Sequence, residues 1–375
     1  MDTTPTDEGS SQYVRPETVN QTGRGAPPIP PQKIVLQQPG GLFGRFGKFL
    51  WIALVVSVIA NIGQRISYES YFAAGDRIEE KYFSGSRVAS DKVAIIRVEG
   101  AIMDPDGFVK RQIERVSKDK HVRAVVLRVD SPGGTVTASD SLYHRLREML
   151  DEREIPMVVS MGGICASGGY YVSMAVGDEK ESIYAEPSTW TGSIGVVIPH
   201  YDVSGLLEKW HIQDDSIASH RFKQLGSPTR KLSKEERAEE RKILQGLVDD
   251  SFARFKEVVR AGRPAFRNNE KTLKDVATGQ VFSSNQALEH GLIDRIGFLE
   301  AAIDRAIELA KLDKETIRVV KYTRHMPGLI EALSGSEARA GFVSGIDLGR
   351  LVDMTAPRAY YLCTWLPSVL SNTRP

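Results

Sequence analysis

The sequence predicts an α/β fold in which helices cover a parallel or mixed sheet. Two β-branched runs, at residues 93–98 and 122–129, flank a stretch at 109–116 in which apolar residues recur at helical spacing. An amphipathic helix at 142–150 and a third buried strand at 156–160 follow. Strands and helices that alternate in this way are typical of a sheet covered by helices.

The rest of the chain adds shorter elements to this core. A capping box formed by Ser233 and Glu236 begins a long helix, which Gly262 and Pro264 end. We also expect short strands at 182–185, 193–198 and 216–219, a helix at 299–310 and a strand at 317–322.

The composition excludes several classes of function. In 375 residues, 49 Lys and Arg balance 48 Asp and Glu, and the net charge of +1 gives no electrostatic basis for nucleic acid as a partner. The two cysteines, Cys165 and Cys363, cannot build a disulfide framework or a cysteine-rich zinc site. The seven histidines form neither an HExxH motif nor a cluster with cysteine, so we expect no bound metal.

The first part of the chain is predicted to form a tail and a membrane anchor. Seven of the eighteen prolines fall in the first 39 residues, and the segment 1–41 has too little apolar surface to fold. The uncharged apolar run at 49–63 is short for the roughly 20 residues that cross a bilayer. The predicted transmembrane helix therefore extends over 42–66, with Arg45 and Lys48 reaching the interface.

Two other interpretations of this helix are a buried core helix and a secretory signal peptide. The long preceding tail and the lack of a clear small-x-small cleavage site argue against a signal peptide. Basic residues flank the run on both sides, so charge alone does not set its orientation. A linker at 67–91, a globular domain at 92–322 and an extension at 323–375 complete the predicted organisation, and the extension is expected to dock on the domain or on a neighbouring subunit.

Two glycine-containing loops follow predicted strands and could carry chemistry. Residues 130–135 read Asp-Ser-Pro-Gly-Gly-Thr, and paired glycines leave backbone N–H groups open to an oxyanion. A tight strand-to-helix turn is the alternative. Residues 162–171 place Ser167 among tiny residues, where a substrate carbonyl could reach its hydroxyl and the N–H of Gly168. The alternative is that Ser167 caps a helix and the glycines serve packing.

These loops, on the alternating pattern, resemble the signal peptide peptidase A family of serine–lysine proteases. Further motifs follow in the expected order: Thr-Gly-Ser-Ile-Gly-Val at 191–196, Ser-Pro at 227–228, and a run from Gly279 to Gly297. The resemblance covers about residues 92–312 and is to the half-length form, with one copy of the catalytic unit. It implies the fold shared by Clp protease and crotonase, built from repeated β-β-α units. The GxSxG elbow of α/β-hydrolases does not match this loop.

The resemblance implies roles for five residues. Ser167 is the expected nucleophile, Lys223 the general base, and Ser193 the group that orients the lysine amine. The backbone N–H groups of Gly134 and Gly168 are the expected oxyanion donors. A lysine is a base only when neutral, and burial favours this by lowering the pKa of lysine from about 10.4. Taken alone, Lys223 would be a solvated charge in a basic loop, and the serine and lysine can come from one subunit or from two.

Three alternatives remain open from the sequence: a histidine base in place of Lys223, and two other functions. His220 or His200 could be the base, but neither has an evident carboxylate to complete a Ser–His–Asp triad. Crotonase-like acyl-CoA chemistry would need an acidic group beside the oxyanion loops. A non-catalytic membrane scaffold of the same fold is the third alternative.

The sequence departs from the family pattern at two places. Cys165 replaces the usual alanine two residues before Ser167, and we expect it to narrow or chemically sensitise the pocket. A small insertion at 177–181 is expected to shift the strand that holds Ser193.

The resemblance also implies partners and a location. Substrates would be remnant signal peptides or other extended polypeptides near a membrane, bound as an added strand. Small and apolar side chains are the family's preference at the cleavage site. Self-association into a ring or dome, a catalytic domain outside the cytoplasm and no cofactor are the remaining expectations.

Overall fold

The computed structural model describes residues 42–73, 78–324 and 359–362, and the chain divides into two units, Met1–Glu69 and Ser70–Pro375. The described residues of the first unit all lie in helix α1 (Leu42–Ala73). Its stretch Gly47–Arg65 is long and apolar enough to cross a membrane by length and composition, and none of it is buried. The predicted tail at 1–41 lies outside the described residues.

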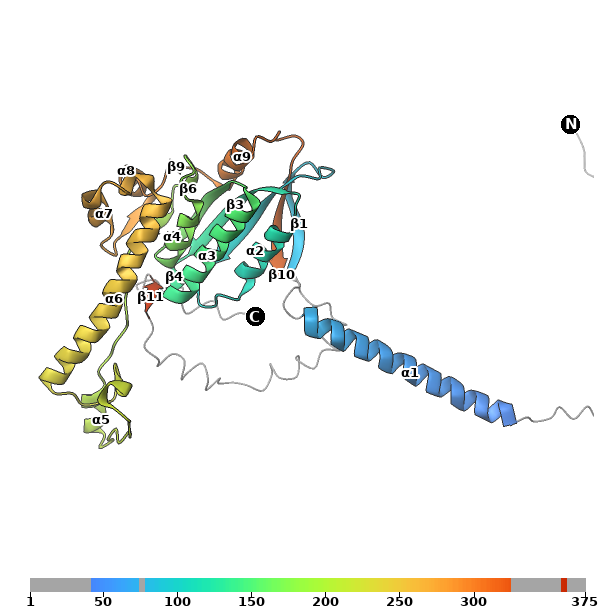
Figure 1. The fold of residues 1–375 in the computed structure, drawn as a ribbon, viewed down its shortest axis with the longest axis horizontal. Coiled ribbons are helices and arrows are strands. Elements are labelled where there is room, and N and C mark those ends of the chain that lie inside the picture. The colour runs from blue at the N-terminus through green and yellow to red at the C-terminus, as the bar shows by residue number, and fades with distance from the viewer. Residues whose placement is uncertain (1–41, 74–77, 325–358, 363–375) are drawn as a thin grey trace, which may run out of the picture. The chain divides into compact units, whose positions relative to one another are not determined.

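The second unit is built on a mixed sheet, which confirms the predicted α/β class (Figure 1). Within the described residues the main path runs in the order β1-β10-β2-β3-β5-β6-β9, and only β1 is antiparallel to its neighbour. The strands are β1 (Ile78–Gly85), β2 (Lys92–Glu99), β3 (Val122–Ser131), β5 (Met157–Ala166), β6 (Ile183–Ala185), β7 (Trp190–Gly192), β8 (Val281–Ser283), β9 (Arg295–Ile296) and β10 (Arg318–Arg324).

Strand β5 divides the sheet into two branches. Its residues 159–161 pair with β6, whereas residues 164–166 pair with β7, which in turn pairs antiparallel with β8. The end of β5 therefore exchanges its β6 neighbour for β7, while Cys165 still pairs with Ser131 of β3, and the next residue after the strand is Ser167.

Helices cover both faces of the sheet because its central strands are apolar on both sides. On β3, Val125 and Leu127 belong to one buried cluster, while Ala124 and Val126 belong to the other. The first cluster packs under α2 (Phe108–Lys118), α3 (Val136–Arg153), α4 (Gly168–Ser173) and α6 (Lys234–Gly262). The second cluster packs under α9 (Leu299–Leu309).

The long helix α6 begins and ends where the sequence predicts. The hydroxyl of Ser233 accepts the N–H of Glu236, whose carboxylate accepts the N–H of Ser233. At the other end, a Cβ on Gly262 would lie 2.6 Å from the carbonyl oxygen of Met174, so only glycine permits this close approach. Pro264 follows in a 3₁₀ turn, Pro264–Phe266.

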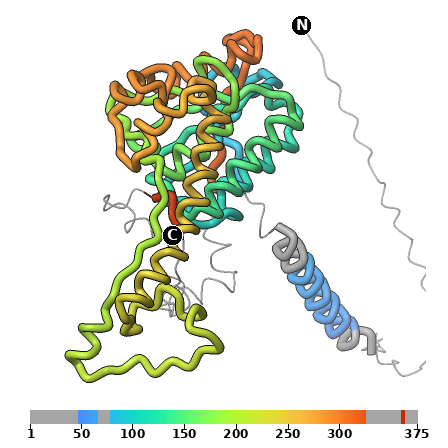
Figure 2. The backbone as a smooth tube through the Cα atoms, turned by 60° about the vertical axis from the view of Figure 1, so that its left-hand side comes forward, coloured from blue at the N-terminus to red at the C-terminus, as the bar shows by residue number. Residues whose placement is uncertain are grey.

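An arm projects from the domain between β7 and the core part of α6. It contains α5 (Ser204–Lys209) and the 3₁₀ turn Arg221–Gln224, and it lies beside the outer half of α6 (Figures 1 and 2). Its apolar side chains Trp210, Ile212 and Ile217 are exposed. This part of the domain therefore has apolar surface that the described residues do not cover.

Two predicted strands are wrong, and several elements were not predicted. The strand expected at 193–198 stands instead at Trp190–Gly192, because Ser193 has a positive φ of 52° that ends the extended backbone. Residues 216–219 lie in the arm without strand structure, away from the sheet whose edge they would need. The elements not predicted include β1, which lies in the segment 67–91 expected to be a linker, and the short elements α5, β8 and β9. They also include α7 (Glu270–Val276), α8 (Ser284–Glu289) and β4 (Gly133–Thr135), which pairs with β11 (Tyr360–Leu362).

Candidate active site

Ser167 occupies a strained turn between β5 and α4. Its φ of 54° and ψ of −114° lie outside the regions that side chains favour, and such strain is concentrated at functional sites. Two backbone hydrogen bonds hold the turn, from Ser167 N–H to the Gly192 carbonyl (2.8 Å) and from Tyr171 N–H to the Ser167 carbonyl (2.8 Å). The side chain makes no capping hydrogen bond to α4, so the interpretation of Ser167 as a helix cap is not supported.

Three glycines from two loops meet beside this serine. A Cβ on Gly168 would lie 3.0 Å from the backbone nitrogen of Gly134 and 3.1 Å from Cα of Gly133. Gly133 itself has a φ of 102°, which glycine adopts without strain. The predicted oxyanion donors, Gly134 and Gly168, are therefore neighbours in space although 34 positions separate them in the sequence. Ser139 also packs against Gly168, since its Oγ would lie 2.5 Å from a Cβ on that residue.

Ser193 lies next to the segment that holds Ser167. It follows Gly192, whose carbonyl accepts the Ser167 N–H, and its own N–H donates to the Gln280 carbonyl (2.7 Å). Ser193 is buried and shares with Ser167 the rare positive φ. The structure thus brings the backbones of Ser167 and Ser193 together. The link between them is the Gly192 carbonyl, which was not predicted from the sequence.

Lys223 lies on the arm, in the 3₁₀ turn Arg221–Gln224, and its side chain is exposed. Within the described residues, no hydrogen bond or ion pair joins it to Ser167 or to Ser193. Leu225, two residues further on, lines the same cavity as Thr135 of β4. The arm therefore reaches the cavity beside the loop of the predicted oxyanion donors, while the lysine amine itself has no partner in the described part of one chain.

The two alternative bases have no carboxylate partner in the described structure. The His220 ring accepts the N–H of Phe222 through Nδ1 (3.3 Å) and packs on the Phe222 ring. This contact caps the 3₁₀ turn and leaves no triad. His200 is exposed on the loop after residue 198.

Cys165 is a core residue. Its side chain is fully buried and lies 3.3 Å from the Ser173 hydroxyl. Burial raises the pKa of its thiol to about 12, which keeps it protonated and unreactive. The expectation that this cysteine chemically sensitises the pocket is wrong, because the side chain points into the packed interior.

The 177–181 insertion is tied down at its ends. Asp178 forms an ion pair with Arg267, and Glu181 forms one with Arg295 (2.8 Å).

Among the described residues, no three His, Cys, Asp or Glu side chains are grouped so that they could hold a metal ion.

Comparison with known proteins identifies the site's family. The sequence profile of peptidase family S49 matches residues 149–313, which contain Ser167 and Lys223. A Synechocystis sp. protein named as a candidate protease is 36% identical over 248 residues, covering 66% of this chain and 84% of that protein. The chain belongs to peptidase family S49.

Other S49 relatives place it near signal peptide peptidase A and protease 4. An Enterococcus faecium protein named as a candidate signal peptide peptidase SppA is 35% identical over 60% of this chain and 62% of that protein. Protease 4 of Salmonella typhi is 33% identical over 59% of this chain, but the match spans only 35% of protease 4. A solved structure of a mutant of the 1510-N membrane-bound stomatin-specific protease aligns at 15% identity with a TM-score of 0.39, over 64% of this chain and 100% of that one. This S49 chain is a serine peptidase of the SppA type.

Proposed function

We propose that this S49 peptidase is a membrane-anchored endopeptidase in which Ser167 is the nucleophile and Lys223 the general base. The observation that carries the proposal is the strained turn at Ser167, whose hydroxyl has no structural partner in the described residues and stands beside Gly168 and Gly134. Strain of this kind persists only where the surrounding packing holds it. The two glycines supply backbone N–H groups for an oxyanion.

The reaction has two stages. Ser167 Oγ forms a bond to the substrate carbonyl carbon while its proton passes to the neutral Lys223 amine. The C–N bond then breaks, and the lysine returns the proton to the leaving amine. Water attacks the acyl-serine and loses a proton to the lysine. The acyl C–O bond then breaks, the lysine passes this proton to Ser167 Oγ, and the new carboxyl terminus, the free serine and the neutral lysine result. Ser193 would orient the lysine amine throughout.

We further propose that Lys223 serves the Ser167 of a neighbouring subunit in a ring or dome. Its amine is exposed and unpartnered in the described chain, on an arm that also exposes Trp210 and Ile217. Exposed apolar surface of this kind favours association. Burial of the arm against a second copy would also favour the neutral amine that a base requires.

The deciding experiment uses the full chain in detergent with a serine-reactive fluorophosphonate probe and a peptide substrate. Ser167→Ala and Lys223→Ala should each abolish cleavage, while Lys209→Ala, which removes a lysine from α5 of the same arm, should not. If the dyad forms between subunits, mixed and reassembled Ser167→Ala and Lys223→Ala chains should recover about a quarter of the sites. Cleavage that survives Lys223→Ala but is lost in His220→Ala would move the base to histidine. Absence of labelling and cleavage in the assembled wild type would favour a scaffold.

The membrane anchor and the substrates complete the proposal. Helix α1 offers one apolar stretch, Gly47–Arg65, as a single-pass anchor, and the catalytic domain would lie outside the cytoplasm. Extended chains such as remnant signal peptides would then reach the site from the membrane. Alkaline extraction tests the anchor, because the full chain should stay with the membrane and a chain lacking residues 42–66 should be released.

A further inference from the structure

A distant strand of this chain lies in the groove beside the proposed oxyanion donors. Strand β11 pairs antiparallel with β4, with Tyr361 opposite Gly134. On its other side, Tyr360 and Val197 exchange two backbone hydrogen bonds of 2.9 and 3.0 Å. Backbone groups thus hold β11 on both edges, which is how a groove binds an extended peptide by strand addition.

The backbone of Tyr361 comes close to the catalytic loop. A Cβ on Gly133 would lie 2.0 Å from the carbonyl oxygen of Tyr361 and 2.6 Å from the amide nitrogen of Gly168. This carbonyl and this amide therefore both lie beside the same glycine. β11 stands where the backbone of a substrate would pass the proposed oxyanion donors.

The Tyr361 side chain fills an aromatic pocket. Its ring is fully buried, stacked on Tyr171 with ring centres 4.9 Å apart, and tilted against Phe255 at 4.6 Å. Its hydroxyl donates to the Ser251 carbonyl at 2.8 Å. Asp140 accepts a hydrogen bond from the Tyr171 hydroxyl, which fixes one wall of the pocket. The pocket thus provides two aromatic faces and one hydrogen-bond acceptor, which together suit a tyrosine.

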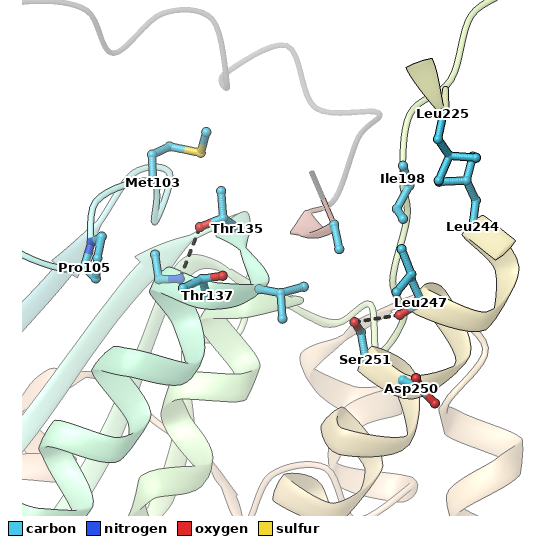
Figure 3. Close-up of a pocket in the computed structure, with 13 residues that line it drawn as sticks. Met103, Pro105, Thr135, Thr137, Ile198, Leu225, Leu244, Leu247, Asp250 and Ser251 are labelled. Atoms are coloured by element: carbon cyan, nitrogen blue, oxygen red, sulfur yellow. Dashed lines mark hydrogen bonds between the residues drawn. The ribbon is translucent and has the colours of Figure 1, made fainter. Parts of the chain in front are cut away.

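The groove continues beyond Tyr361. A cavity of about 680 Å³ begins at Ala359, next to β11. Figure 3 shows Thr135 on one side of it and Leu225, Leu244 and Leu247 on the other. A peptide longer than β11 would find apolar walls there for further side chains.

We propose that this groove selects extended peptides that place an aromatic side chain between Tyr171 and Phe255, and that Tyr361 is its resident occupant. The inference rests on the proposed peptidase function and names its specificity. It replaces the small side chain that the family resemblance implies with a large aromatic one at this subsite. Because the occupant belongs to the chain, it competes with every substrate, and its local concentration is that of a tethered ligand.

The first test compares full-length Tyr361→Ala with wild type on peptides that differ only in having Phe, Tyr or Ala at one position. The variant should cleave the aromatic peptides with KM several-fold lower and kcat unchanged, and should discriminate against the Ala peptide. Tyr322→Ala, which removes a fully buried tyrosine from β10, controls for general destabilisation and should leave KM unchanged. An unchanged KM in Tyr361→Ala, with Ser167 still labelled by the fluorophosphonate, would overturn the inference and leave the peptidase function intact.

A second test needs no catalysis. In the Ser167→Ala, Tyr361→Ala double variant, a fluorescent peptide with the sequence of residues 357–363 should bind and raise the melting temperature. The same peptide with Ala in place of Tyr361 should bind at least several-fold more weakly. Binding of the unaltered peptide in the absence of both fluorophosphonate labelling and cleavage of every test peptide by the wild-type chain would retain the groove and refute the peptidase proposal. Equal binding of the two peptides would refute the aromatic subsite. If Tyr361→Ala fails to fold, Tyr361→Phe replaces it in both tests, because this variant keeps the ring and removes only the hydrogen bond to the Ser251 carbonyl.

Discussion

The contact between Gly168 and its neighbours predicts a measurable defect for Gly168→Ala. The new methyl group would lie 2.5 Å from Ser139 Oγ and 3.0 Å from the Gly134 nitrogen. Real Cβ atoms do not approach so closely, so the loop must move by several tenths of an ångström. Ser139 cannot simply swing away, because it is fully buried and donates to the Thr135 carbonyl at 2.9 Å. The displacement therefore falls on the backbone N–H groups that would bind the oxyanion.

The size of the effect follows from the sensitivity of catalysis to geometry. A misplacement of about 1 Å can cost about a hundred-fold in rate, and loss of one oxyanion donor costs about as much or more. We expect kcat for Gly168→Ala to fall between about ten- and a hundred-fold, and overpacking to lower the free energy of unfolding by about 1–3 kcal/mol. Peptide cleavage and thermal melting measure the two quantities separately.

Two variants make this prediction specific. Gly163→Ala adds the same methyl group to the same stretch of chain, but its nearest atom would be 3.7 Å away, so activity should be unchanged. Adding Ser139→Ala to Gly168→Ala removes the closest contact and should restore part of the activity, because sites in contact are coupled. Full activity of Gly168→Ala at an unchanged melting temperature would refute the role of this N–H.

Three further predictions concern the rest of the domain. Cys165 should resist iodoacetamide at about pH 8 in the folded chain and react in denaturant, because burial raises its pKa to about 12. Mass spectrometry of the peptide that contains Cys165 measures the labelling, and rapid labelling of the folded chain would contradict this prediction. Asp294 pairs with Arg263 (2.7 Å) and accepts two backbone N–H groups at the start of β6. Asp294→Ala should therefore lower the free energy of unfolding by about 3 kcal/mol. A much smaller loss, measured by chemical denaturation, would show that the pair contributes little. For Asp119, burial is the largest single influence and opposes ionisation, but the hydrogen bonds from Lys92 and from the His121 N–H, together with the Lys92 charge, outweigh it and hold the pKa of the carboxyl below its usual value. The carboxylate therefore stabilises the fold at pH values above the unfolded pKa of about 4, and this stabilisation is lost as pH falls through the folded pKa. Asp119→Asn should lower the free energy of unfolding at about pH 7 and leave it nearly unchanged at about pH 2. An equal loss of unfolding free energy at both pH values would contradict the assignment.

The local pattern of the sequence determined most of the core. The central strands and helices follow from apolar periodicity, which depends only on which residues face the interior. The ends of α6 were predictable because Ser233 and Glu236 bond to each other within its first turn and Pro264 follows shortly after its last residue. The contact of Gly262 with Met174 was not predictable, because it joins distant segments. The serine of the site was also visible, since its loop follows a buried strand and is rich in glycine.

Only the tertiary structure decided how these parts meet. The placement of β7 depends on the backbone turn at Ser193, and no local propensity reveals a positive φ in a serine. The meeting of Gly133 with Gly168, and of Tyr361 with Tyr171, joins segments far apart in the sequence through strand pairing and aromatic packing. Such contacts depend on which edges of the folded sheet are left unpaired, and this is a property of the whole domain rather than of any single segment.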